Sequence, residues 1–322
     1  MHRVETGFVD RLPARIRPRA TVWHRKGVAT TYKLHDKVFS NRRSRGLYEG
    51  HRPSLDNLQR RIVTELDDQG YALTSFGELF SEGEWETMDA YRRAFIEETE
   101  AGLSSEATGE GGGELHRRAG KEFLVRRYDT GAELTVRDPW LSACLSRRML
   151  DIASEYLQLW PKLEYIDLWY SIPVGKSAER RASQLWHRDF DDRHLLKAFL
   201  YLSDVDADAG PFEYLPGSQP GGPYADIVPW EPMGLGRVPE DMIQTRAPAD
   251  AVKTFTAPTG SIIFCNTSGL HRGGFAESKP RVLATVTYCS PASLASLTRR
   301  NYRLDATSDT SSLDAVVRYA LT

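Results

Sequence analysis

The sequence has little of what builds disulfide frameworks, membrane spans or strongly charged surfaces. Its 322 residues include only three cysteines, widely spaced and without a Cys-x-x-Cys pair, which excludes a disulfide framework or a cysteine-based zinc site. No apolar run approaches the roughly 18 residues that a membrane helix needs, and the N-terminus lacks the apolar segment of a secretory signal. The net charge of −2 gives no overall field that favours nucleic acid or an anionic membrane. We therefore expect a cytoplasmic protein with no membrane span and no nucleic-acid partner.

The composition is that of an ordinary globular chain, with 40% hydrophobic and 27% charged residues, but the charge is unevenly placed. Residues 1–53 hold 13 Lys and Arg against four Asp and Glu, a formal charge of +9, which leaves −11 for the rest of the chain. A nucleic-acid arm, a transit peptide or a lid for an acidic substrate would fit such a segment. The aromatic residues Trp23, Tyr32, Phe39 and Tyr48 favour an irregular arm packed across the acidic body instead, because disordered tails are poor in aromatics.

The segment from residue 54 to residue 160 has helical patterns with clear start signals. Apolar residues between Leu55 and Leu66 recur at helical spacing. Ser81 begins a second helix with a capping-box pattern, and Asp138 caps a third. The sequence therefore predicts a helical flank over residues 54–160.

After about residue 160 the sequence changes to short β-rich runs separated by turn residues. The runs are Tyr165–Ile172, Gln184–Trp186, Leu195–Leu202, Phe212–Leu215, Val252–Phe255, Ser261–Cys265 and Arg281–Tyr288. Many short strands at such spacing predict an all-β sandwich or barrel with the helices packed outside it. Because no linker divides the chain, we predict one domain over residues 54–322, with its β core at about 161–290 and a C-terminal extension.

Residues with metal-binding chemistry gather in this β half. His187 and Asp189 stand two residues apart at a predicted strand end, so their side chains share a face. His271 comes directly after the predicted strand Ser261–Cys265. Two histidines and one carboxylate on one face leave coordination positions open, an arrangement typical of non-haem Fe(II) oxygenases. Arg281 opens the last strong strand, where its guanidinium could bind a carboxylate of a co-substrate beside the metal.

Each part of this pattern is weak by itself. The chain has eight histidines, so one His-x-Asp is nearly expected by chance, and a single histidine is more often packed than ligating. His194, five residues after Asp189, is interpreted in that ordinary way, as a solvated or supporting residue. The order of His-x-Asp, a later His and then an Arg on the next strand is much less expected by accident, and it predicts a metal site.

Three segments also carry a resemblance to a known family. They are Gln184–Asp189 (QLWHRD), Lys197–Leu202 (KAFLYL) and Ala209–Ser218 (AGPFEYLPGS). Together they closely resemble the phytanoyl-CoA dioxygenase family over about residues 160–290. The resemblance implies an Fe(II)- and 2-oxoglutarate-dependent oxygenase, mainly β with flanking helices, whose core is a double-stranded β-helix (a jelly roll, cupin-like). The first 150 residues or so match nothing in it.

The resemblance also implies the roles of individual residues. The family's metal ligands match His187, Asp189 and His271, and its 2-oxoglutarate arginine matches Arg281. Iron(II), 2-oxoglutarate and O₂ are therefore the expected cofactor and co-substrates. The strand with Trp169 and Tyr170 borders the co-substrate in this family, and one of these two side chains must face inward because strand residues alternate.

Three further residues are assigned to the site from their positions. Lys197 and Phe199 share a strand face, so an inward Phe199 brings Lys197 with it. An inward lysine needs an anion, either 2-oxoglutarate or an acidic substrate; the alternative is a lysine at the strand mouth that reaches solvent. Gln184 precedes His187 by three residues and is assigned to substrate contact or to orienting a ligand. Ordinary barrel packing is the alternative for all of these residues.

The expected activity is hydroxylation, or another oxidation, of a small-molecule metabolite with release of succinate and CO₂. Specificity is expected from two loops over the barrel mouth, Gly175–Ser183 and Gly221–Asp250. Other classes stay open at this stage. A protein or peptidyl hydroxylase would use the same residues, a cupin-type isomerase would use the barrel without redox chemistry, and a metal-free binding protein would leave the triad unexplained.

Overall fold

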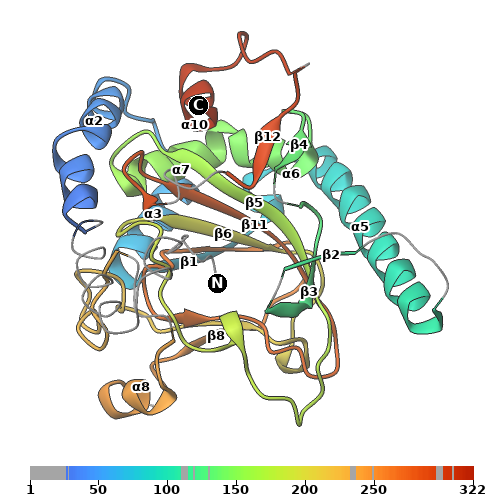
Figure 1. Ribbon diagram of the computed structural model, residues 1–322. Helices are drawn as coiled ribbons and strands as arrows, with labels where there is room; N and C mark the ends of the chain where they lie inside the picture. Colours follow the sequence, from blue (N-terminus) through green and yellow to red (C-terminus); the bar gives the residue numbers. More distant parts are fainter. Residues whose placement is uncertain are drawn as a thin grey trace, which may run out of the picture.

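The computed structural model describes residues 27, 29–109, 115–118, 120–129, 131–232, 237–248, 250–294, 300–306 and 308–322. Its centre is a pair of facing β-sheets with helices outside them (Figure 1). None of the helices in these residues has the length and apolar character needed to span a lipid bilayer. The predicted β core with flanking helices, a jelly-roll arrangement, is confirmed.

The larger sheet has seven strands and the smaller has three. Their orders are β1-β9-β6-β11-β5-β3-β2 and β10-β7-β8. The strands of the larger sheet are β1 (Tyr71–Ser75), β2 (His116–Arg118), β3 (Lys121–Arg126), β5 (Lys162–Ser171), β6 (Leu196–Tyr201), β9 (Ser261–Cys265) and β11 (Arg281–Cys289). Those of the smaller sheet are β7 (Phe212–Tyr214), β8 (Lys253–Phe255) and β10 (His271–Arg272). A separate parallel pair joins β4 (Ala132–Leu134) to β12 (Tyr302–Leu304).

Strand β11 shows how side-chain alternation divides the interior into two layers. All of its nine residues are buried. Val282, Ala284 and Val286 belong to the main hydrophobic core, whereas Leu283 belongs to a second core with Phe199 of β6. Because successive side chains of a strand point to opposite faces, one face packs on the helices and the other lines the space between the two sheets. Arg281 shares the face of Leu283.

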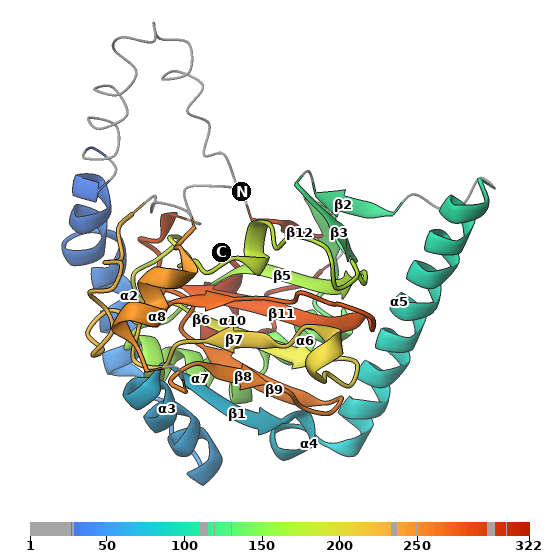
Figure 2. The same cartoon turned by 90° about the horizontal axis from the view of Figure 1, so that it is seen from below.

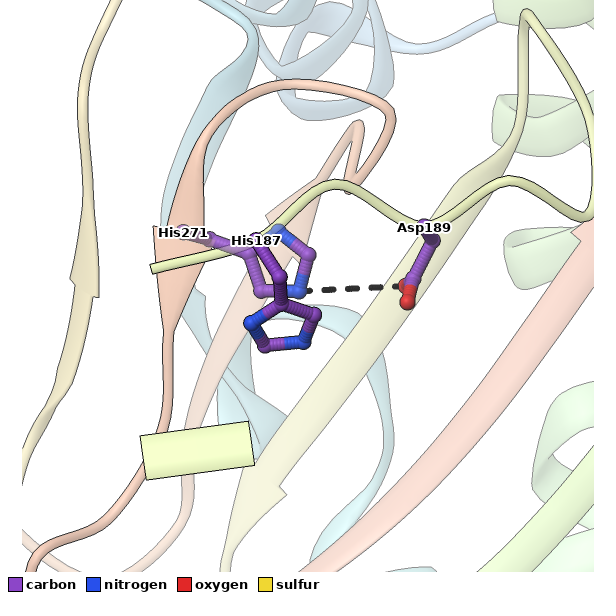
Figure 3. Close-up of side chains that lie close together, drawn as sticks. All are labelled: His187, Asp189 and His271. Carbon is purple, nitrogen blue, oxygen red and sulfur yellow. Dashed lines mark ion pairs between the residues drawn. The ribbon is translucent and has the colours of Figure 1, made fainter. Parts of the chain in front are cut away.

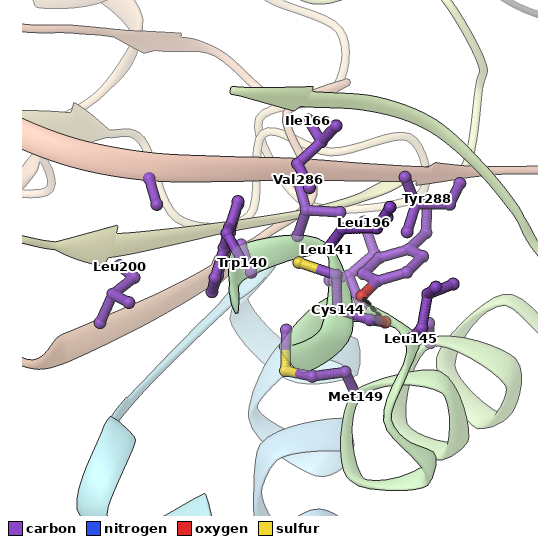
Figure 4. Close-up of a cluster of buried hydrophobic side chains, with 14 of the residues drawn as sticks. Trp140, Leu141, Cys144, Leu145, Met149, Ile166, Leu196, Leu200, Val286 and Tyr288 are labelled. Atoms are coloured by element: carbon purple, nitrogen blue, oxygen red, sulfur yellow. Dashed lines mark hydrogen bonds between the residues drawn. The ribbon is translucent and has the colours of Figure 1, made fainter. Parts of the chain in front are cut away.

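Helices cover the outer face of the larger sheet. They include α3 (Asn57–Gln69), α5 (Glu82–Thr108), α6 (Pro139–Leu145) and α7 (Arg147–Leu157). Trp140 and Cys144 of α6 pack among Val286 and Tyr288 of β11 (Figure 4). The Trp140 indole donates a hydrogen bond to the Thr285 carbonyl at 3.0 Å, so the polar group of this buried ring is satisfied. The main core is thus a helix-on-sheet layer.

The start signals read from the sequence lie where the helices begin. Ser81 caps α5 with a complete capping box, and Asp138 caps α6. The helix predicted after Asp138 is in fact two helices, because Ser146 adopts an extended conformation and caps α7. Its hydroxyl accepts a hydrogen bond from the Met149 amide, which satisfies one of the free donors at the start of the new helix.

The predicted helical flank is only partly correct, because residues 54–160 also contain strands. Strand β1 pairs with β9 at one edge of the larger sheet, and β3 pairs with β5 and β2 on the other side. The flank therefore contributes to the wall of the barrel. The predicted strand Gln184–Trp186 is wrong: residues Ala182–Gln184 form a short 3₁₀ helix. The C-terminal extension ends in α10 (Ala315–Leu321).

The basic N-terminal segment is helical where the structure describes it. Residues 29–37 are helical, followed by α2 (Ser40–Gly50), so the prediction of an irregular arm is wrong there. The Tyr32 hydroxyl donates to Asp192, and Ser44 donates to the Trp160 carbonyl. Figure 2 shows α2 beside the sheets, at the side of the molecule opposite the long helix α5. Trp23 lies outside the described residues, and the domain boundary at residue 53 stays a prediction.

A buried ion pair ties β3 to β5, and its loss has a large expected cost. The Arg126 guanidinium donates to the Asp167 carboxylate at 2.5 Å, with side-chain exposures of 9% and 0%. Asp167→Ala would leave Arg126 buried without its counter-charge, and we expect a loss of about 3–5 kcal/mol in the free energy of unfolding. Denaturant unfolding measures it. Glu133→Ala, which breaks an exposed pair with Arg303, should change stability by less than about 1 kcal/mol. Equal losses of unfolding free energy in Asp167→Ala and Glu133→Ala would contradict a structural role for the buried ion pair.

Candidate metal centre

The structure brings the three residues predicted as metal ligands to one place. One ligand atom from each of His187, Asp189 and His271 lies within 4.8 Å of the other two, and the three side chains point toward one another (Figure 3). The segment before Asp189 is joined to β10 by a pair of backbone hydrogen bonds, from the His187 amide to the His271 carbonyl at 2.9 Å and the reverse at 3.0 Å. This bridge fixes the spacing of the two imidazoles, whose ring centroids lie 4.2 Å apart.

Each imidazole is oriented by a hydrogen bond to the backbone carbonyl of the residue two positions earlier. The Nδ1 atom of His187 lies 2.8 Å from the Leu185 carbonyl, and that of His271 lies 3.0 Å from the Gly269 carbonyl. A carbonyl can only accept, so Nδ1 carries the proton and Nε2 keeps its lone pair. Burial lowers the pKa of His271 to about 4 and that of His187 well below its usual value. Both imidazoles are therefore uncharged at neutral pH, and the lone pair on Nε2 is available to bind a metal.

The Asp189 carboxylate is held ionised by a neighbouring lysine. Burial alone would raise the pKa of Asp189, but the Lys197 ammonium lowers it well below its usual value. The Lys197 ammonium donates to Asp189 Oδ2 at 2.5 Å, and this oxygen lies 3.8 Å from His271 Nε2. Burial likewise would lower the pKa of Lys197, and Asp189 raises it above its usual value. The anion that the inward lysine meets is thus Asp189, and the alternative of a lysine in solvent is wrong.

One cavity contains the triad and most of the other predicted site residues. Its lining is made by Lys121, Phe123, Leu124, Trp169, Ser171, Ser183, His187, Asp189, Lys197, Phe199, Phe212, His271, Gly273, Arg281 and Leu283. It lies between the two sheets, on the inward face of β5, β6 and β11. A molecule in this cavity would therefore contact the triad and Arg281 together.

Arg281 is the unusual cation of this cavity. Its side chain is only 5% exposed, and its guanidinium donates to the Gly210 carbonyl at 2.9 Å. Within the described residues no carboxylate pairs with it, and its Nε has no hydrogen-bond partner. Burial accordingly lowers the pKa of Arg281. A buried guanidinium without a counter-charge is costly, so an anionic ligand fits this end of the cavity.

Two of the predicted site residues lie elsewhere. Tyr170 faces the helices, packs in the main core and donates its hydroxyl to Glu100, so only Trp169 of this pair lines the cavity. Gln184 is 1% exposed and hydrogen-bonds backbone atoms of Arg181 and Gly274. Its side chain supports the loops around the site and does not line the cavity. These placements correct the assignments of Tyr170 to the co-substrate and of Gln184 to the substrate.

Arg188, between the two first ligands, is a positioning residue that sequence reasoning missed. Its guanidinium donates to the carbonyls of Ser218 and Ser268 at 2.5 and 2.6 Å. It also donates to the carbonyls of Val228 at 2.6 Å and Ala225 at 3.4 Å. Side chains alternate along the chain, so the residue between two inward ligands points the opposite way. Arg188 thereby connects the segment of the first two ligands to the loop before His271. The only hint of this contact in the sequence is the segment Ala209–Ser218 (AGPFEYLPGS), here called the PGS element.

The PGS element forms hydrogen bonds beside His271 and to Arg281, at the two ends of the cavity. Ser218 accepts a hydrogen bond from the Leu270 amide at 2.7 Å, next to His271. Gly210, at the other end of the element, supplies the carbonyl for Arg281. A side chain at Gly210 would meet the backbone of Phe275 at 2.4 Å, and its φ is +74°, so only glycine fits this turn. The two ends of the motif are therefore structural, and Phe212 between them lines the cavity.

The chain matches a known protein family over most of its length. The model of the phytanoyl-CoA dioxygenase family matches residues 66–280. No curated protein sequence matches. The epimerase SnoN from nogalamycin biosynthesis is 16% identical, with 72% of this chain and 81% of that chain covered and a TM-score of 0.47.

Two further solved structures are similar at comparably low sequence identity and TM-score. EctD from S. alaskensis, solved with 2-oxoglutarate and 5-hydroxyectoine, is 15% identical, covers 74% of this chain and 79% of its own, and has a TM-score of 0.48. HygX from Streptomyces hygroscopicus, solved with nickel, 2-oxoglutarate and hygromycin B, is 16% identical, with coverages of 73% and 88% and a TM-score of 0.43. At such TM-scores the likeness does not identify a substrate.

Proposed function

The chain belongs to the phytanoyl-CoA dioxygenase family, and on this premise we propose that it hydroxylates a small-molecule metabolite. Membership makes it an Fe(II)- and 2-oxoglutarate-dependent oxygenase. In the proposal, His187, Asp189 and His271 bind the iron, and Arg281 binds 2-oxoglutarate through its distal carboxylate. A single observation supports these assignments best: the three ligand atoms and the unpaired guanidinium line one cavity.

The donor set of the cavity fits the metal. Two neutral imidazole nitrogens and one carboxylate form the facial set that leaves positions open in non-haem Fe(II) oxygenases. When bound, iron and 2-oxoglutarate supply the activation of O₂ and the oxidation of a C–H bond, with succinate and CO₂ as products. The protein's own contribution is to hold these groups in place.

The side chains around the triad have separate tasks in this proposal. The carbonyls of Leu185 and Gly269 keep the two imidazoles in one tautomer, and Lys197 orients the Asp189 carboxylate. Arg281 offers its guanidinium to a carboxylate in two-point geometry, which a lysine cannot reproduce. Phe199 and Phe212 line the same cavity, so an apolar wall limits water near the reacting groups.

A metabolite panel tests the proposed activity. The iron-loaded protein, 2-oxoglutarate and O₂ are incubated with each compound, and the products are analysed by mass spectrometry together with succinate. Hydroxylation predicts a product with one added oxygen atom and succinate in equal amount. A product of unchanged mass formed without consumption of 2-oxoglutarate would instead indicate a non-redox isomerase, and oxidation of peptides alone would indicate a peptidyl hydroxylase.

Two glycines with positive φ provide a matched test of the Arg281 assignment. A Cβ at Gly274 would lie 2.1 Å from an Arg281 guanidinium nitrogen, whereas a Cβ at Gly131 would meet no atom within 4 Å. Gly274→Ala must therefore displace the guanidinium, and it also places alanine at a φ of +49°. We expect about a tenfold loss of 2-oxoglutarate affinity, the worth of one hydrogen bond to a charged group.

Calorimetric titration of the iron-loaded variants with 2-oxoglutarate measures this difference. Gly131→Ala also places alanine at a positive φ, of +86°, but away from Arg281. It should bind the co-substrate as the unchanged protein does, and both variants should keep the iron stoichiometry. Equal 2-oxoglutarate affinities for the two variants would contradict the assignment of Arg281, provided that thermal melting shows both to be folded.

A further inference from the structure

The helical residues 29–37 of the basic N-terminal segment contact the chain just after a predicted metal ligand. Tyr32 is only 6% exposed, and its hydroxyl donates to the Asp192 carboxylate at 2.5 Å and accepts a hydrogen bond from the Arg193 amide at 3.0 Å. These two partners follow Asp189 by three and four residues. The match to the family model begins only at residue 66, so Tyr32 lies outside the part of the chain that this model describes.

Asp192 joins this contact to the end of strand β11. The residue is 2% exposed, and its carboxylate accepts hydrogen bonds from the Ser290 amide and the Arg193 amide, both at 2.8 Å. Ser290 directly follows β11. A buried carboxylate is costly unless it is hydrogen-bonded, so Tyr32 is one of the donors that keep Asp192 in this position. The backbone after Asp189 is thereby held from two sides.

Trp230, in the loop predicted to cover the barrel mouth, contacts the ligand residue itself. Its indole N–H donates to the Asp189 carbonyl at 2.9 Å, and the Asp189 amide donates to the Thr267 carbonyl at 2.8 Å. The peptide groups on both sides of the ligand are therefore held. The Trp230 ring packs against the Tyr32 ring, with centroids 5.4 Å apart and planes tilted by 48°. Tyr32 thus supports the ligand by two routes, through Asp192 and through Trp230.

Given the proposed role of Asp189 as an iron ligand, on which this inference rests, we propose that Tyr32 and Trp230 are positioning residues of the iron site. Neither side chain lines the cavity of the triad, so both act through the backbone of Asp189. This residue supplies the only carboxylate of the triad, and a shift of its backbone moves the one anionic donor. The N-terminal segment is then part of the catalytic unit.

Titration with Co(II) in place of iron tests the proposal, because the visible absorption of a bound Co(II) ion depends on the geometry of its ligands. Tyr32→Phe removes both hydrogen bonds of the hydroxyl and keeps the ring, and Trp230→Phe removes the indole donor. Loss of a contact that orients a metal ligand typically weakens metal binding 10- to 100-fold. Each variant should therefore bind Co(II) about tenfold more weakly than the unchanged chain, with an altered absorption spectrum.

Tyr48→Phe is the matched control, because it changes a buried tyrosine of the same N-terminal segment. Tyr48 is 1% exposed, and its hydroxyl donates to the Glu155 carboxylate at 2.8 Å. Neither residue lines the cavity of the triad. The variant also loses a hydrogen bond to a charged group, so it should lower the melting temperature as Tyr32→Phe does. Its Co(II) affinity and absorption spectrum should stay those of the unchanged chain.

Thermal melting without metal should show that all three conservative variants are folded. Co(II) affinity and absorption equal to those of the unchanged chain in either Tyr32→Phe or Trp230→Phe would overturn the proposal, and so would the same changes in Tyr48→Phe. Either result would leave the iron site itself standing. Absence of Co(II) binding to the unchanged chain would overturn the iron site, and the two positioning roles with it.

Discussion

Alanine in place of His187, Asp189 or His271 is expected to remove iron binding and, with it, turnover of 2-oxoglutarate. Each change deletes one of three protein ligands whose donor atoms lie within 4.8 Å of one another. Loss of a supporting residue around a metal typically weakens binding 10- to 100-fold, so loss of a ligand should cost roughly 100-fold or more in apparent iron affinity. Anaerobic titration with Fe(II) and metal analysis after desalting measure the effect.

The exposed His116 of β2 provides the control for this experiment. His116→Ala removes an imidazole that is not among the cavity-lining residues and should keep one iron per chain. Thermal melting without metal should show that the ligand variants are folded. Unchanged iron stoichiometry in all three ligand variants would contradict the site.

Arg281→Lys should weaken 2-oxoglutarate binding while leaving iron binding intact. The change keeps the positive charge but loses the planar guanidinium, and a buried ammonium cannot contact a carboxylate at two points. The expected loss is about 1–3 kcal/mol, the usual worth of a hydrogen bond to a charged group, or roughly 5- to 150-fold in affinity. Titration of the iron-loaded protein under anaerobic conditions gives this affinity directly.

A surface arginine shows whether the effect is specific. Arg303 forms an exposed ion pair with Glu133, and Arg303→Lys should leave both iron and 2-oxoglutarate binding unchanged. If Arg281→Lys altered only the iron affinity, Arg281 would be a structural residue and the co-substrate would bind elsewhere in the cavity.

The parts of the fold that the sequence predicted well are those with strong local patterns. The strand Ser261–Cys265 has the predicted limits, and Arg281 opens β11 as expected. Both are short runs dominated by apolar and β-branched residues and bounded by turn residues, the pattern of strands buried on both faces. The His-x-Asp spacing and the later histidine predicted the triad, because two-residue spacing places side chains on one face.

Other features depended on contacts that no local pattern reveals. The sequence predicts a helical flank where strand β3 lies, although its Phe123 lines the cavity, because β3 is a short run whose partner β5 lies about 40 residues further along the chain. Alternation along a strand predicts that Trp169 and Tyr170 face opposite ways, but it does not say which of them is inside. Arg188 escaped notice because its acceptors are backbone carbonyls of three distant segments.

The proposed activity is tested most directly by succinate formation on admission of O₂ to the protein loaded anaerobically with Fe(II) and 2-oxoglutarate. The unchanged chain should form succinate only when iron, 2-oxoglutarate and O₂ are all present. His187→Ala should form none at the same iron concentration, and Arg281→Lys should need a higher 2-oxoglutarate concentration for the same rate. Succinate formed equally well by His187→Ala, or none formed by the unchanged chain with any compound of the panel, would contradict it.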